Sequence, residues 1–393
     1  MDGSLFTLAE RMGRLGTESA FDVLSKARAL ERQGRDIIHL EIGEPDFSTP
    51  PHIVAAAKKA LDDGYTHYGQ TPGLPELREA IARHVTETRG IPVQPDQVVV
   101  TPGAKPIMFF TILALVSPGD EVLLPDPGFP IYASVVRFAG GVPVPIALRE
   151  QRDFGFDLDE LERRAGPQTK LLILNSPQNP TGGVLSPTDL RRIAAVAQRH
   201  RIPILSDEVY RRFSYGESPH SIASLPGMAD LTILLDGFSK AYAMTGWRLG
   251  YGVMPVPMAE AVSRLMVNSN SCTASFTQIA GVAALEGDQR DSLAMVEAFR
   301  RRRDLVVAGL NAIPGVSCCI PAGAFYAFPN VTAFGRPAQV IADHLLQDAG
   351  VAVLAGTGFG QYGEGYLRLS YAASEARLSQ ALDRMAASLA RLK

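Results

Sequence analysis

Short apolar segments alternate with helical patterns over about residues 96–255. The apolar segments are rich in β-branched and aliphatic residues, and they are QVVVT (97–101), EVLLP (121–125), VPVPI (142–146), KLLILN (170–175), IPILSD (202–207), TILLD (232–236) and LGYGVM (249–254). Helical spacing of apolar residues falls between them, at about 104–116, 130–138 and 187–200. Several segments are apolar on both faces, which is typical of parallel strands covered by helices. The alternation therefore predicts an α/β fold, with a large domain built on a mainly parallel, helix-covered sheet.

The two ends of the chain carry a different pattern. A long helical stretch at about 289–311 is followed by short strand and helix patterns, which lie near 324–328, 337–349, 351–354, 366–370 and 374–391. Another helical pattern lies near the start, at about 20–33. We therefore expect a smaller α+β domain built from both chain ends. The predicted divisions are 1–50 (N-terminal segment and part of the small domain), 51–295 (large domain) and 296–393 (small C-terminal domain).

Composition and charge narrow the class of protein. The 393 residues are 46% hydrophobic and 20% charged, which is ordinary for a globular protein with a sizeable core. The formal net charge of -3 gives no electrostatic reason to expect nucleic acid or a membrane surface as partner. The longest apolar run, 107–116, is about half a membrane span and indicates a buried helix. The N-terminus lacks the continuous apolar segment of a signal peptide.

The cysteines and histidines suggest neither a disulfide framework nor a metal site. There are three cysteines, two of them adjacent, and seven scattered histidines without an HExxH or Cys-x-x-Cys pattern. We therefore expect no metal and a reducing compartment, the cytoplasm.

Two turns that follow predicted strands carry candidate binding residues. Gly103, Ala104 and Lys105 open a helix with Pro106 near its first position, and a helix N-terminus is a natural phosphate site. The alternative is an ordinary strand-to-helix turn. Asn179, in NSPQNPTGG, lies at the carboxyl end of a strand, where open α/β sheets bind ligands, although the segment is equally a well-formed loop.

Two later segments supply candidate catalytic groups. Asp207 ends a strand, where its carboxylate could stabilise a protonated pyridine ring, with Tyr210 three residues on; alternatively, Asp207 caps the next turn. Lys240 lies among small residues such as Ser239, which suits an amine that forms a Schiff base. Arg248 could bind a phosphate bidentately. A solvated lysine and a structural arginine are the alternative.

Six separated motifs occur in an order that resembles one enzyme family. The motifs are GEPDF (43–47), NPTG (179–182), SDEVY (206–210), GFSK (237–240), MTGWRLG (244–250) and LRLSY (367–371). Over nearly the whole chain, this pattern resembles the class I aminotransferases, fold type I pyridoxal-phosphate enzymes, in their aspartate-aminotransferase-like branch. The resemblance implies a ping-pong transfer of an amino group from an L-amino acid, with an aspartate-like donor favoured, to a 2-oxo acid such as 2-oxoglutarate.

The resemblance also implies roles for the matching residues. Lys240 would hold pyridoxal 5′-phosphate as a Schiff base and shuttle the substrate proton, while Asp207 would pair with the ring nitrogen. Tyr210 and Asn179 would bind the ring hydroxyl oxygen. The phosphate contacts would come from Gly103, Ala104, Lys105, Ser239 and Arg248.

Further matching positions concern stacking, the substrate and a second subunit. Phe129 would stack on the ring. Arg368 would bind the substrate α-carboxylate, helped by the backbone at Gly43 and by Asn179. Tyr68 would reach the phosphate of a neighbouring subunit, which implies a homodimer with shared sites.

The preferred side chain of the donor stays open. Gly237 stands where many relatives have serine, and no position marks a second arginine for a distal carboxylate. Apolar residues could line a pocket for aromatic donors or belong to the core, and they are Phe21, Ile107 and Phe110; Thr17 and Ser19 could receive an acidic donor. An aromatic or broad-range aminotransferase and a β-lyase of the same fold are the alternatives. Whether residues 10–21 form a mobile lid is also open.

A glycine motif near the C-terminus invites a different interpretation. Gly358, Gly360 and Gly363 fit the G-x-G-x-x-G pattern, but a strand pattern rather than a helix follows them. We expect a loop that positions Arg368.

Overall fold

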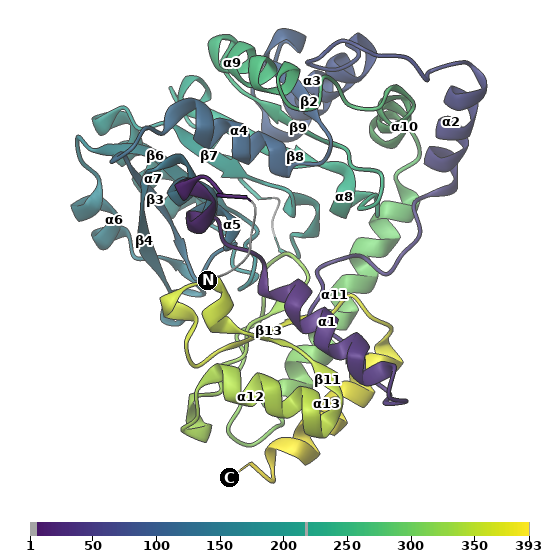
Figure 1. The fold of residues 1–393 in the computed structure, drawn as a ribbon, viewed down its shortest axis with the longest axis vertical. Coiled ribbons are helices and arrows are strands. Elements are labelled where there is room, and N and C mark those ends of the chain that lie inside the picture. Colours follow the sequence, from purple (N-terminus) through teal and green to yellow (C-terminus); the bar gives the residue numbers. More distant parts are fainter. Residues whose placement is uncertain (1–5, 217–218, 393) are drawn as a thin grey trace.

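The computed structural model describes residues 6–216 and 219–392, and its centre is an eight-stranded sheet (Figure 1). In spatial order the strands are β2 (Val98–Thr101), β9 (Gly250–Val253), β8 (Thr232–Gly237), β7 (Ile204–Asp207), β6 (Thr169–Asn175), β3 (Glu121–Asp126), β4 (Val142–Arg149) and β5 (Gly155–Phe156). The pairs from β8 to β4 are parallel, whereas β9 runs antiparallel to both neighbours and β5 runs antiparallel to β4. The predicted, mainly parallel sheet is confirmed.

Helices cover both faces of this sheet. One face packs against α4 (Lys105–Leu115), α5 (Ile131–Ala139) and α9 (Val256–Val267). The other face packs against α6 (Leu158–Arg164), α7 (Pro187–His200), α3 (Pro75–Arg89) and α10 (Ser275–Glu286), with α2 (Pro51–Asp62) beside α10. Leu171 and Leu172 show why the strands are apolar on both faces, because these consecutive residues enter opposite cores. The apolar run at 107–116 is the buried helix α4, as predicted.

A smaller α+β unit lies below the large sheet in Figure 1 and contains both purple and yellow segments. Its helices are α1 (Ser19–Glu31), α11 (Arg290–Asn311), α12 (Ala338–His344), which continues as a π-helical turn (Leu345–Ala349), and α13 (Glu375–Leu389). Its strands form the sheet β10 (Tyr326–Ala327), β13 (Leu367–Ser370), β12 (Leu354–Ala355) and the parallel pair β1 (Ile38–His39) with β11 (Val351–Ala352). The β1–β11 pair joins the two chain ends; the domain boundaries at residues 50 and 295 stay a prediction.

Two local features bear on the site. Gly358 and Gly363 lie in two short 3-10 turns (Gly356–Phe359 and Gln361–Gly363), Gly360 joins them, and β13 follows, so the loop expected from the sequence is found. The N-terminal segment packs its 3-10 helix (Glu10–Arg14) against α5, and the Gly16 N–H donates to Ser134 Oγ at 2.8 Å. In the described part of the chain, no helix combines the length and apolar character that crossing a bilayer requires.

Candidate active site

A cavity of about 390 Å³ lies at the carboxyl ends of the central parallel strands. It brings together eleven of the residues predicted from the sequence, which are Gly43, Ala104, Lys105, Phe129, Asn179, Asp207, Tyr210, Ser239, Lys240, Arg248 and Arg368. Gly103 adjoins it through Arg248. Tyr68 is not part of this cavity and is 91% exposed. The strand ends of a parallel sheet meet at one edge, which is why residues far apart in sequence converge here.

Asp207 is a buried carboxyl at the end of β7. The Tyr132 hydroxyl donates to its Oδ2 at 2.6 Å, and the Val209 N–H donates to its Oδ1 at 3.2 Å. Asp207 therefore caps the next turn and also faces the cavity. Burial raises the pKa of Asp207 to about 6, while the hydrogen bonds from Tyr132 and Val209 act in the opposite direction. A cation in the cavity would stabilise the ionised form of this carboxyl.

Lys240 lies in the four-residue helix α8 (Phe238–Ala241), directly after β8. Its Nζ donates to the carbonyl oxygen of Gly43 and is 6.0 Å from the centroid of the Tyr210 ring. Burial lowers the pKa of Lys240 to about 8. A larger share of neutral amine near neutral pH is what a nucleophilic lysine requires.

The start of α4 and Arg248 form a cradle for an anion. Gly103 has a φ of +85°, and a Cβ there would collide with the Arg248 guanidinium. A side chain at Gly250 would also collide with the backbone of Ala104. The first N–H groups of a helix have no partner within the helix and, with the helix dipole, favour a phosphate. Ser239 also lines the cavity, on the turn that carries Lys240.

Arg368, on β13, is a buried guanidinium with hydrogen-bonding capacity to spare. Its Nη2 donates to the carbonyl oxygen of Glu41, and its Nη1 lies 3.4 Å from Asn179 Oδ1. Its Nε is buried and has no hydrogen-bond partner in the described residues. The guanidinium carbon is 4.6 Å from the centroid of the Tyr326 ring. A carboxylate arriving in the cavity would match this planar fork.

The sequence analysis missed several polar residues that hold the predicted ones. Tyr132 bonds Asp207, and Asn175 binds the Asn179 N–H at 2.9 Å. The Tyr326 hydroxyl is 2.6 Å from the Tyr210 hydroxyl. Of these residues, Tyr132 could have been predicted most readily from the sequence, because it lies three residues after Phe129 at the start of a helical pattern.

The apolar candidates for a specificity pocket separate into two groups. Ile107 and Phe110 belong to the core of the large sheet. Phe21 lines the cavity, with 61% of its surface exposed.

Lys105 lies at the same cavity, where its Nζ pairs with Glu18 and lies 5.2 Å from the centroid of the Phe129 ring.

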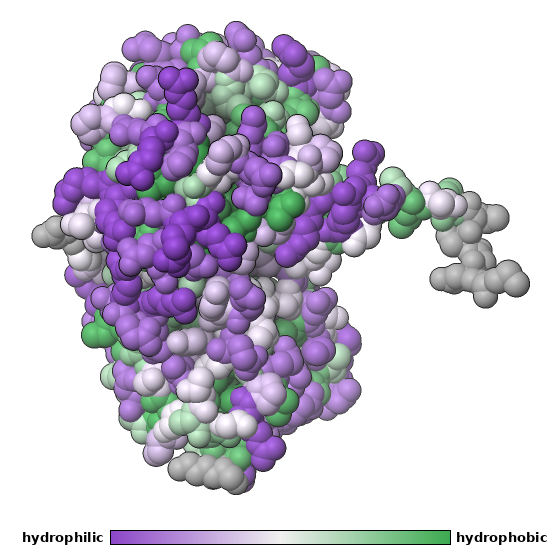
Figure 2. All heavy atoms as spheres, turned by 90° about the vertical axis from the view of Figure 1, so that its left-hand side faces the viewer, coloured by the Kyte–Doolittle hydropathy of each residue, from purple (hydrophilic) through white to green (hydrophobic). Residues whose placement is uncertain are grey.

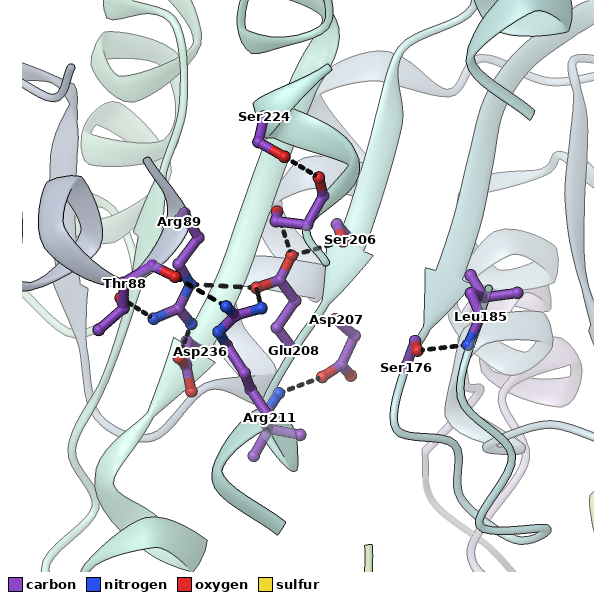
Figure 3. Close-up of polar contacts among 12 residues, drawn as sticks. Thr88, Arg89, Ser176, Leu185, Ser206, Asp207, Glu208, Arg211, Ser224 and Asp236 are labelled. Atoms are coloured by element: carbon purple, nitrogen blue, oxygen red, sulfur yellow. Dashed lines mark hydrogen bonds and ion pairs between the residues drawn. The ribbon is translucent and has the colours of Figure 1, made fainter. Parts of the chain in front are cut away.

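Behind the strand ends, a buried arginine joins the segments that carry Asp207 and Lys240. Figure 3 shows Glu208 turned toward Arg89 and Asp207 turned away from it. The Arg89 Nε donates to Glu208 Oε2 at 3.1 Å, and its Nη2 donates to Asp236. Burial alone would lower the pKa of Arg89, but Asp236 and Glu208 outweigh it and raise that pKa. This buried charge cluster was not predicted from the sequence.

Comparison with known proteins decides the family. Residues 35–385 match the family model of aminotransferase class I and II. The chain belongs to the class I and II aminotransferases. An aspartate aminotransferase of Pyrococcus abyssi is 44% identical over 89% of this chain and 91% of its own, and aromatic-amino-acid aminotransferase 2 of Thermococcus litoralis is 41% identical over 96% and 97%. The solved aspartate aminotransferase of Thermus thermophilus with maleate superposes with a TM-score of 0.93 at 38% identity, covering 98% of this chain and all of that one.

The protein is thus an aminotransferase that uses pyridoxal 5′-phosphate, amino acids and 2-oxo acids. The cavity fits the cofactor. A phosphate matches the cradle at Gly103 and Arg248, a protonated ring nitrogen matches the buried Asp207 carboxyl, and an aldehyde matches the amine of Lys240.

Proposed function

We propose that this aminotransferase takes its amino group from an acidic L-amino acid, aspartate or a close analogue, and passes it to a 2-oxo acid such as 2-oxoglutarate. The observation that carries the proposal is the position of Lys105, a cation on the cavity wall whose carboxylate partner there is Glu18. A substrate with a distal carboxylate could replace Glu18 as the partner of Lys105. The name of the Pyrococcus relative and the maleate, a dicarboxylate, with the Thermus enzyme support the same choice.

The cofactor would be held by residues at both ends of the cavity. Gly103, Ala104, Lys105 and Arg248 would bind the phosphate, the first three through backbone N–H groups, and Ser239 would add a hydroxyl. Phe129 would stack on the ring.

The other end of the ring would meet polar side chains. Asp207 would accept a hydrogen bond from the protonated ring nitrogen, and Tyr210 and Asn179 would donate to the ring hydroxyl oxygen. When bound, pyridoxal phosphate supplies an aldehyde for the amino group and a ring that takes up the electron pair left at the substrate Cα.

Lys240 would act twice. Its amine would hold the cofactor covalently between turnovers and, once displaced, take the proton from the Cα atom of the amino acid. The pKa of about 8 supports this role, since it gives the amine a larger neutral fraction near neutral pH than an ordinary lysine has. A positioned base of this kind contributes about 10²–10⁴-fold to the rate.

Arg368 would bind the α-carboxylate and orient Cα toward Lys240. Its unpartnered Nε and its burial support a site for an anion, because an uncompensated buried cation is costly. The Gly43 carbonyl oxygen, which accepts a hydrogen bond from the Lys240 Nζ, would keep the amine at the part of the cavity next to Gly43.

We also propose a homodimer with shared active sites. Tyr68 is almost fully exposed and lies outside its own cavity, which supports a role in a neighbouring subunit. The described residues before the 3-10 helix at Glu10–Arg14 leave the body of the molecule as an arm in Figure 2, and Leu8 among them is 74% exposed. A cytoplasmic location remains our expectation.

A second donor class has one observation in its favour. Phe21 lines the cavity and offers an apolar surface, and the Thermococcus relative is named for aromatic amino acids. An aromatic or broad-range donor preference is therefore the main alternative.

The donor can be identified from the first half-reaction. Single amino acids are mixed with the cofactor-loaded enzyme without an acceptor, and the absorption of the cofactor is followed from its aldehyde form to its amine form. We expect fast conversion by aspartate or glutamate, and a loss of at least about tenfold for these donors, but not for phenylalanine, in Lys105→Met. Lys105→Arg keeps the charge and is the control.

Two other results would contradict the proposal. Conversion mainly by tyrosine or phenylalanine would establish the aromatic alternative. Accumulation of pyruvate from a β-substituted amino acid, with no conversion by any donor, would establish a β-lyase.

A further inference from the structure

A second cavity, here called the rear cavity, lies on the other side of the β7 and β8 strand ends. Its volume is about 470 Å³, and its lining includes His84, Arg89, Arg212, Phe238, Tyr242 and Leu293. Val209 borders both cavities. The size is within the range of about 300–1,000 Å³ typical of small-molecule sites.

One arginine on the rear cavity, Arg212, has no ion-pair partner among the described residues. Arg89 is fully occupied by Asp236 and Glu208. Arg211, whose Nη2 donates to the Thr88 carbonyl oxygen at 2.7 Å, is 3.9 Å from the already paired Glu208. Arg212 forms no ion pair with the described residues, and Glu87 on the lining is exposed to solvent. An anion beside Arg212 would therefore meet a guanidinium that no described carboxylate pairs.

Two polar atoms beside this charge also lack a partner. Arg212 Nε and Ser214 Oγ are buried and form no hydrogen bond within the described chain, and both residues line the rear cavity. The Arg212 Nη1 donates to the Tyr242 hydroxyl at 3.2 Å, and the guanidinium carbon lies 5.2 Å from the centroid of the Tyr242 ring, which leaves Nε without a partner. Buried donors without acceptors are uncommon and costly, so a ligand that brings acceptor oxygens would be favoured.

His84 lies beside the arginines of the rear cavity. Burial, followed by the charges of Arg89, Arg212 and Arg211, lowers the pKa of His84 to about 4. The charges of the three arginines add to the effect of burial on this pKa, and the same charges attract an anion.

Part of the rear-cavity lining is apolar. It includes Phe238, Tyr242, Leu285 and Leu293, and Leu293 is 57% exposed at the surface. The apolar residues suit a hydrocarbon group, and Arg212 suits a carboxylate. We propose that the rear cavity binds a small carboxylic acid that carries an apolar group, with the carboxylate at Arg212 and Ser214.

The position of this site has a consequence for the active site. Phe238 and Ala241 line the rear cavity and are the first and last residues of α8, the helix that carries Lys240. A ligand there would contact the back of the turn that presents the amine, so the site is placed to influence the enzyme from outside the substrate cavity.

The test measures binding of 3-phenylpropionate to the cofactor-loaded enzyme by calorimetry. The Arg368→Gln variant is used as the background because it removes the proposed α-carboxylate site of the active-site cavity. We expect one binding event per chain in this background, and no binding of 3-phenylpropan-1-ol, which lacks the carboxylate. Adding Arg212→Gln should weaken binding by about tenfold or more, and Ser214→Ala should weaken it less.

Arg83→Gln is the matched control, because Arg83 is an exposed arginine on α3 that pairs with Glu286 outside the rear cavity. It should leave binding unchanged. The proposal is overturned if the Arg368→Gln enzyme binds no 3-phenylpropionate, or if binding is unaffected by both Arg212→Gln and Ser214→Ala. Since only binding is measured, neither result depends on which amino acid the enzyme prefers.

Discussion

At the residue scale, Asp207 shows how a neighbouring hydroxyl can shift the pKa of a buried carboxyl. Its pKa is raised to about 6 by burial, and the Tyr132 hydroxyl opposes that rise through a 2.6 Å hydrogen bond. A carboxyl with a raised pKa carries its charge above that pKa and loses it as the pH falls through it. Tyr132 therefore extends the range of pH over which Asp207 is ionised.

We predict that Tyr132→Phe raises the pKa of Asp207 further, because the ionised form loses a hydrogen-bond donor. The acid limb of the kcat/KM profile should then move to higher pH, while the alkaline plateau falls by less than about tenfold. Tyr362→Phe, a tyrosine that packs on Arg149 outside the cavity, is the control and should leave the profile unchanged. An unshifted acid limb in Tyr132→Phe would show that this hydrogen bond does not govern Asp207.

Residue types and positions on strand ends made part of the site predictable from sequence. Asp207, Lys240 and Arg368 stand in motifs at the ends of predicted strands or within one, and the structure brings them to one cavity. Arg89 gave no such signal. Its partners Glu208 and Asp236 are 119 and 147 residues away, so only the folded chain shows that the three charges meet.

At the element scale, Arg89 fastens the last turn of α3 to the ends of β7 and β8. Its side chain is 1% exposed, so its removal would leave two carboxylates buried without their counter-charge. Breaking a buried ion pair by removing one partner is strongly destabilising, unlike breaking a surface pair.

We predict that Arg89→Met lowers the free energy of unfolding by about 3–5 kcal/mol, measured by urea denaturation. The same substitution at Arg83, which lies on the same helix and forms an exposed pair with Glu286, should cost less than about 1 kcal/mol. Equal effects of the two substitutions would contradict a structural role for the buried cluster.

Element types were better predicted than strand directions. The apolar segments at 97–101, 121–125 and 170–175 are strands, as expected, but an alternation of apolar residues does not record which way a strand runs. β9 runs antiparallel because it pairs with β2 and with β8. β2 is distant in the sequence, and the turn that carries Lys240 separates β8 from β9.

At the scale of the whole molecule, one chain provides nearly all the predicted site, and Tyr68 is the exception. If Tyr68 acts in the active site of the neighbouring subunit, a substitution of Lys240 and a substitution of Tyr68 can be placed in different chains of one dimer. In a mixed dimer of Lys240→Ala and Tyr68→Ala chains, one site would carry both substitutions and the other would carry neither.

We predict that mixing these two variants under conditions that allow subunit exchange gives more activity than either variant alone. Each site needs Lys240 from its own chain and Tyr68 from its neighbour, so the mixed dimer regains one intact site. Two preparations of the same variant, mixed in the same way, are the control. If the mixture is no more active than the better variant, although mixed dimers have formed, Tyr68 does not act across the interface.

The central claim is that Lys240 is the amine that makes this cavity a transaminating site. The most direct measurement is the rate at which aspartate converts the absorption of the bound cofactor in the wild type and in Lys240→Ala. We predict a folded variant that still binds the cofactor but converts it at least about 100-fold more slowly, with Lys58→Ala, an exposed lysine on α2, behaving as the wild type. Conversion by Lys240→Ala at the wild-type rate would contradict the account.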